Sequence, residues 1–165
     1  MRRVVVAIVG VTVVALYATL MAVQALVLDP LAAMPGLTMD QIHADVRESG
    51  GRVGWNIAIV IITAAFGVGL AVIAGVFGQW KRLSPLVEAS IFLGIVTLGA
   101  VANFYSGFAL RMDVADAYGI SGRDYTVWPG VLYVTSLVAL VALIPVLVII
   151  RLHSRSARSV AAAGD

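Results

Sequence analysis

The stretch GWNIAIVIITAAFGVGLAVIAGVFG, residues 54–78, contains 25 residues and no charged side chain. About 20 apolar residues are enough to cross the ~30 Å hydrocarbon core of a bilayer. Backbone groups inside a bilayer must be hydrogen-bonded within the protein, which favours a helix over an isolated strand. The stretch therefore predicts a transmembrane helix.

Three further apolar runs of similar length lie on either side of it, at residues 4–28, 86–110 and 127–150. Glu88, near the start of the third run, is the only acidic or basic residue within the four. Consecutive helices joined by short connections lie antiparallel. The sequence thus predicts an all-α integral membrane protein with a four-transmembrane-helix up-down bundle. It forms a single membrane domain over residues 1–165, with an outer loop at 29–53 and a cytoplasmic tail at 151–165.

The composition excludes the class of soluble domains, because 61% of the residues are hydrophobic, only 12% are charged and the mean hydropathy is +1.02. The absence of cysteine excludes disulfides and thiolate chemistry. A pI near 9.3 suggests nucleic acid at first sight. The basic residues are instead sorted by membrane side, so we expect no nucleic-acid partner.

The first run follows Met1-Arg2-Arg3, a beginning that it shares with secretory signal peptides. The apolar region of a signal peptide has 7–15 residues, whereas this run has 25. We therefore expect an uncleaved first helix.

The orientation follows from the lysines and arginines near the ends of the predicted helices. With the N-terminus inside, seven lie on the cytoplasmic side and four outside. The seven are Arg2, Arg3, Lys81, Arg82, Arg151, Arg155 and Arg158, and the four are Arg47, Arg52, Arg111 and Arg123. We expect both termini in the cytoplasm and, from the content of alanine, valine and glycine without cysteine, a bacterial plasma membrane.

The first outer loop contains the signals of a short helix of its own. Thr38 and Gln41 have the spacing of a capping box, and Gly50 follows at a position typical of a helix end. Between them, Ile42 and Val46 recur at helical spacing among charged residues. This pattern predicts an amphipathic helix whose apolar face lies against the bilayer surface or the tops of the other helices.

The third helix has clear signals at both of its ends. Ser84 followed by Pro85 is typical of an N-cap with proline at the first helical position. We expect the helix to continue beyond residue 110 to about Tyr118 and to end at Gly119.

The second helix has a stripe of small residues spaced four apart, which lets another helix approach closely. We call it the packing stripe: Thr63, Gly67, Ala71 and Gly75. One interpretation is that the second and third helices use their small residues on each other inside the monomer. The other is that part of a stripe is left for a partner subunit.

A candidate polar pocket lies near the outer face, where Asn103 is a polar side chain well inside the third span. We predict that three other residues at similar depth line it with Asn103: Asn56, Ser106 and Tyr133. The alternative is ordinary interhelical hydrogen bonding, worth roughly 0.6–1.7 kcal/mol per pair.

No catalytic motif is recognisable, and the polar residues of the outer loop favour a solvated face over a metal site. His43 lies among Asp40, Asp45 and Glu48, without a second histidine on that side. Both histidines lie outside the spans, so a haem ligated within the membrane is not expected, nor any other cofactor or metal.

The predicted function is a non-catalytic accessory or scaffold subunit of a membrane assembly. The expected partners are the lipid bilayer and a membrane protein or second copy, bound through the second or third helix. One alternative is a transport or pore component that works as an oligomer. The other is a membrane enzyme or a lipid or small-ligand binder that uses the polar pocket.

Overall fold

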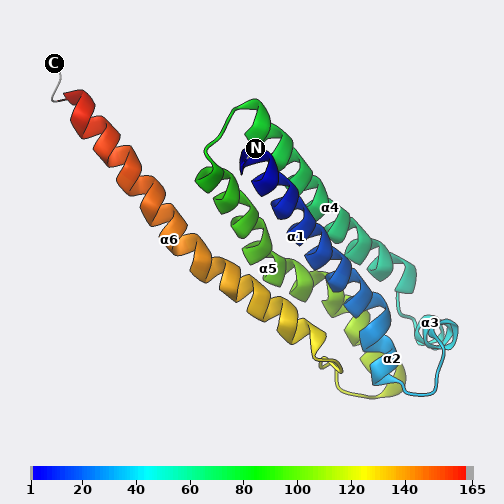
Figure 1. Cartoon of the computed structure of the whole chain (residues 1–165). Coiled ribbons are helices and arrows are strands. Elements are labelled where there is room, and N and C mark those ends of the chain that lie inside the picture. Colours follow the sequence, from blue (N-terminus) through cyan, green and yellow to red (C-terminus); the bar gives the residue numbers. More distant parts are fainter. Residues whose placement is uncertain (1, 163–165) are drawn as a thin grey trace.

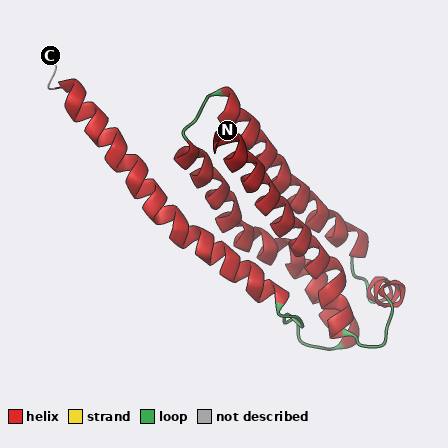
Figure 2. Ribbon diagram, in the orientation of Figure 1, coloured by secondary structure: helices red, strands yellow, loops and turns green. Residues whose placement is uncertain are grey.

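The structure is a computed structural model that describes residues 2–162, with side chains described for residues 3–152. All regular elements in this part of the chain are helices (Figure 2). Four helical runs there are long and apolar enough to cross a membrane, which confirms the all-α class and the four predicted long apolar helices. They are α1 (Arg2–Val23) with its continuation, α4 (Val53–Trp80), α5 (Pro85–Tyr118) and α6 (Trp128–Ala162).

The four long helices run alternately up and down, so the molecule has two ends (Figure 1). We call the end with the N-terminus and the turn between α4 and α5 the first end. The second end holds α2 (Asp29–Ala33), α3 (Met39–Glu48) and the loop between α5 and α6. Helices α1, α4 and α5 pack side by side, whereas α6 contacts mainly α5 and diverges from the others toward the first end.

Helix α5 begins and ends where the sequence predicts. Ser84 Oγ accepts a hydrogen bond from the Val87 N–H at 3.3 Å, and Pro85 occupies the first turn. Gly119 follows the last helical residue with φ +63°, a left-handed conformation that glycine adopts without strain.

Helix α3 lies in the loop after the first span. The Thr38 N–H donates to Gln41 Oε1 at 2.8 Å, and the Gln41 N–H donates back to Thr38 Oγ1 at 3.4 Å. These two bonds satisfy backbone donors that the first turn leaves free. The apolar face of α3 packs on the ends of α4 and α5 in one buried cluster: Ile42, Val46, Val53 and Val114.

The first and fourth helical runs are longer than the predicted spans. After α1 the chain continues through a π-helix, η1 (Gln24–Leu28), directly into α2, so the predicted boundary at residue 28 lies inside one continuous run. The predicted tail at 151–165 is helical as far as Ala162, because residues 151–162 contain neither glycine nor proline and include several alanines and arginines, which favour helix. Residues 163–165 lie outside the described part of the chain.

The main core lies halfway along the bundle, while the outer surfaces of the long helices are apolar. The core residues are Val14, Tyr17, Met21, Ala71, Phe92, Val96, Leu132 and Ala139. On α4, the side chains of Ile62, Phe66 and Ile73 are 65–66% exposed. Such a surface is unfavourable in water and suits the hydrocarbon of a bilayer.

Candidate functional site

Asp113 joins the start of α4 to the last turns of α5 at the second end. Its Oδ2 accepts two hydrogen bonds, one from Asn56 Nδ2 at 2.6 Å and one from the Arg52 backbone N–H at 2.9 Å. A carboxylate at this position satisfies a free backbone donor of α4 and interacts favourably with the positive end of the helix dipole. Asn56, 4% exposed, therefore has a structural partner outside the predicted pocket.

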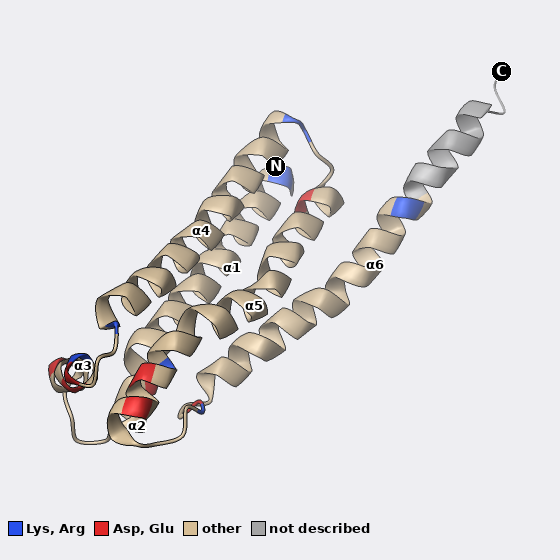
Figure 3. Cartoon of the chain, turned by 180° about the vertical axis from the view of Figure 1, so that it is seen from behind, with Lys and Arg blue, Asp and Glu red and all other residues tan. Residues whose placement is uncertain are grey.

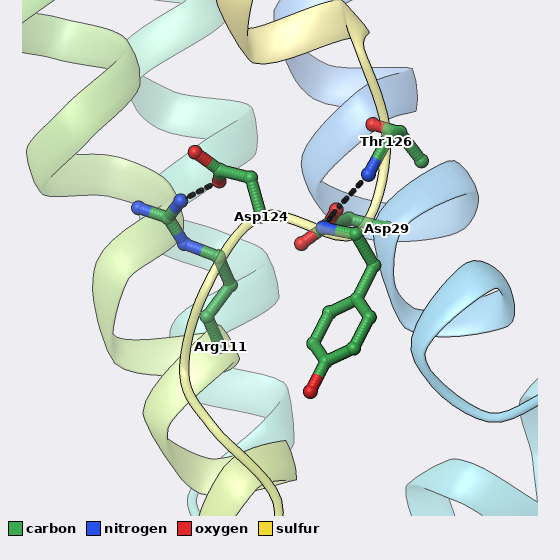
Figure 4. A network of polar contacts seen from close by, with 5 residues as sticks. Asp29, Arg111, Asp124 and Thr126 are labelled. Atoms are coloured by element: carbon green, nitrogen blue, oxygen red, sulfur yellow. Dashed lines mark hydrogen bonds and ion pairs between the residues drawn. The ribbon is translucent and has the colours of Figure 1, made fainter.

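Asp29 holds the loop that leads into α6. Its side chain is 2% exposed, and Oδ1 accepts the backbone N–H of Tyr125 at 2.7 Å and that of Thr126 at 3.2 Å (Figure 4). On the other side of the same loop, Asp124 forms an ion pair with Arg111 of α5. The loop that leads into α6 is thus fastened to both α2 and α5.

In the described part of the chain, no hydrogen bond connects the residues of the predicted polar pocket to one another. Asn103 and Ser106 are both buried on α5, and Ser106 Oγ has no hydrogen-bond partner among the described residues. Tyr133 is half-buried on α6. No hydrogen bond links any two of Asn56, Asn103, Ser106 and Tyr133, and the cavities described below are lined by other residues.

The packing stripe of α4 is divided between two environments. Ala71 is fully buried, and a Cβ added to Gly75 would lie 3.5 Å from Val11 Cγ2 of α1. Gly67 and Thr63, which lie one and two turns before Ala71, instead line a cavity of about 180 Å³ between α1, α4 and α5. A Cβ added to Gly67 would have no heavy atom within 4 Å. Gly75 therefore packs against α1, whereas Thr63 and Gly67 are half-buried and border a cavity that the chain does not fill.

The closest helix contacts are made by glycines outside the packing stripe. A Cβ on Gly10 of α1 would lie 2.3 Å from the Phe92 ring of α5, and one on Gly99 of α5 would lie 2.6 Å from the Tyr17 ring of α1. Substitution there forces a neighbouring side chain or helix to move. Gly10 was not predicted from the sequence, because no second small residue lies four positions before or after it.

A polar contact halfway along the bundle, which sequence analysis also missed, joins three helices. Tyr17 Oη lies 3.0 Å from Ser136 Oγ of α6, and Ser136 Oγ donates to the Val96 carbonyl oxygen of α5 at 2.8 Å. Hydroxyl groups in the apolar interior require such partners. A tyrosine and a serine at matching depth in two spans are the signal that could have identified this contact.

The acidic face of α3 is engaged with α5. Asp45 Oδ2 accepts the Tyr118 hydroxyl at 2.6 Å, and the His43 Nε2 is buried without a hydrogen-bond partner. Among the residues that the structure describes, no three of the histidines and acids lie together in a way that could hold a metal ion. The polar contacts at the second end hold α3 and the α5–α6 loop against the long helices.

Comparisons with protein-family models, curated proteins and solved structures found no match to this chain.

Proposed function

We propose that this protein is a non-catalytic accessory or scaffold subunit of a membrane assembly, which holds a partner by helix–helix packing. The observation that carries this proposal is the half of the packing stripe beside an unfilled cavity, where Thr63 and Gly67 are half-buried and line a volume of about 180 Å³. The partner is a transmembrane helix that presents a side chain to this cavity.

The physical basis is the weakness of the hydrophobic effect between helices in lipid. Lipid tails are as apolar as leucine, so helices associate through close van der Waals contact, which small residues permit. The residues around the cavity beside Gly67 lack van der Waals contacts on the side that faces it. A partner side chain that fills the cavity gains contacts with them. The exposed side chains of Phe66 and Leu98 flank this position and widen the contact surface.

The proposal is tested by purifying the tagged chain in mild detergent and identifying the proteins that accompany it. We expect Gly67→Leu to reduce the amount of a bound partner by roughly tenfold or more, since a filled central pocket is typical of residues that dominate an interface. Gly69→Leu is the matched control. It places the same side chain on the same helix, where an added Cβ also meets no heavy atom within 4 Å, but it does not line this cavity.

Three outcomes would contradict the scaffold proposal. The first is wild-type chain that carries no other protein, and the second is equal retention of the partner by both leucine variants. The third is a cellular phenotype that Asn103→Ala abolishes while the partner stays bound, which would favour the ligand-binding or enzymatic alternative. Discrete homo-oligomers that conduct ions in liposomes would favour the pore alternative.

We also propose that the chain lies in the plasma membrane of a bacterium, with both termini in the cytoplasm. The seven-to-four distribution of lysine and arginine supports the first end as the cytoplasmic side. A reporter fused after residue 165 that is active only outside the cytoplasm should give no signal. A strong signal from that reporter would reverse the orientation.

A further inference from the structure

A deep apolar groove separates α6 from α1 and α5 in the half of the molecule near the first end. Its volume is about 500 Å³, and its walls include Val9, Gly10, Phe92, Val138, Ala139 and Ala142. Both opposite views show α6 diverging from the other helices in this half (Figures 1 and 3). The groove therefore opens sideways, toward the position of the lipid tails.

The depth of the groove matches one leaflet of a bilayer. On α1 it extends from Val5 to Val13, which is about 12 Å at 1.5 Å per residue. One leaflet contributes about 15 Å to the ~30 Å hydrocarbon core. The groove closes near the middle of the bundle, where Ser136 bonds to Tyr17 and to the Val96 carbonyl.

The mouth of the groove carries positive charge. Arg3 lies two residues before Val5, the first groove residue of α1, and its side chain is exposed, whereas Arg151 lies nine residues beyond Ala142, the last groove residue of the diverging α6. Among the described residues of the first end, Lys81 and Arg82 are also exposed, and the acid Glu88 is fully buried against Gln79. The exposed charge at this mouth is therefore basic and attracts anionic headgroups.

We propose that this groove binds an acyl chain of an anionic phospholipid from the leaflet at the first end, with the headgroup beside Arg3. The length of the groove favours a lipid over a partner helix, because an acyl chain occupies one leaflet whereas a transmembrane helix crosses both. The basic mouth favours an anionic headgroup over a zwitterionic one. This site is distinct from the one at Gly67, so each can fail without the other.

Native mass spectrometry of the full chain in mild detergent tests the proposal with phosphatidylglycerol and phosphatidylcholine of identical acyl chains. We expect wild-type chain to retain phosphatidylglycerol preferentially. Val138→Trp, which fills the groove, should reduce the bound lipid at least about threefold, an estimate for a blocked apolar pocket. Leu137→Trp is the matched control, because Leu137 and Val138 are 58% and 61% exposed and only Val138 lines the groove.

The headgroup contact is tested separately. Arg3→Gln should lower the preference for phosphatidylglycerol by about fivefold, the effect expected for one basic residue at a membrane surface, and Arg151→Gln, which is farther from the groove, should lower it less. Lys81→Gln, on the turn between α4 and α5, should lower it less. Equal loss in all three variants would overturn the assignment of the headgroup to this mouth.

A second measurement does not depend on a bulky substitution. The chain has no cysteine, so Val138→Cys and Leu137→Cys each give one site for a fluorophore. At a few lipids per protein in detergent, a phospholipid with a quencher on its acyl chain should quench the label at position 138 more strongly than that at 137. Equal quenching, equal retention by the two tryptophan variants, or loss of a co-purified protein from Val138→Trp alone would overturn the proposal, the last by identifying a protein as the occupant.

Discussion

The two ends of the molecule are held together by different forces. At the second end, polar side chains bind backbone and side-chain groups far away in the sequence, as Asp29 does with Tyr125 and Asp113 with Asn56. In the half near the first end, α1, α4 and α5 meet through close packing, as Gly10 does with Phe92, and α6 stands apart.

This difference follows from the solvent that each part meets. Loops beyond the hydrocarbon core contain unpaired backbone groups, which carboxylates can bind. Within the hydrocarbon, every backbone group is already bonded inside its helix, so shape is what remains to hold helices together. The contacts at the second end therefore hold the start of α6. The groove lies in the half near the first end, where α6 diverges from the other helices.

The largest effect should come from breaking the packed half. Gly10→Leu places a side chain where the Phe92 ring lies, since even a Cβ would be 2.3 Å from Cδ2. We expect a loss of about 1–3 kcal/mol or more in the free energy of unfolding. Denaturation in detergent, followed by circular dichroism, measures this loss.

Gly69→Leu is again the control, because an added Cβ there meets no heavy atom within 4 Å. Its stability should stay close to that of the wild type. Similar losses in both variants would mean that leucine acts through something other than the contact between α1 and α5.

Residue types and spacing were enough to predict the spans, the start of α5 at Ser84 and its end at Gly119, because these depend on neighbours in the sequence. The division of the packing stripe was not predictable in this way. Whether Gly75 or Gly67 meets α1 depends on the crossing of two helices, which hydropathy does not encode.

The candidate site shows the same limit. Asn56 was predicted to line the polar pocket, whereas in the structure it is buried and its partner is Asp113, which lies beyond the predicted end of the third span at residue 110. The π-helix η1 continues the first run into α2, where Asp29 is buried near the α5–α6 loop. No local pattern around residues 24–28 indicates such an element.

The next effect should come from removing the anchor at the second end. Asp29→Ala leaves the N–H groups of Tyr125 and Thr126 without their acceptor, at a cost of about 1–3 kcal/mol for buried groups. Amide hydrogen exchange of these two residues should accelerate strongly. Asp29→Asn keeps an acceptor oxygen and should lose less, whereas equal losses would assign the effect to the charge of Asp29.

The smallest effect should come from the contact at which the two halves meet. Tyr17→Phe removes the hydroxyl that bonds Ser136, worth about 0.6 kcal/mol and at most about 1.7 for an interhelical hydrogen bond. Ser136 keeps its bond to the Val96 carbonyl, so α6 should remain on α5 but lose its polar contact with α1. Because α6 packs mainly on α5 and diverges from α1 toward the first end, this small loss should appear as motion more than as instability. Spin labels on cysteines introduced at Val5 and Leu147 should show a broader distance distribution in Tyr17→Phe than in the wild type.

Tyr105→Phe is the control, since Tyr105 is 72% exposed and its hydroxyl makes no hydrogen bond in the described part of the chain. If both variants leave the distribution unchanged, packing alone positions α6, and the midpoint contact does not separate the anchored half from the open one.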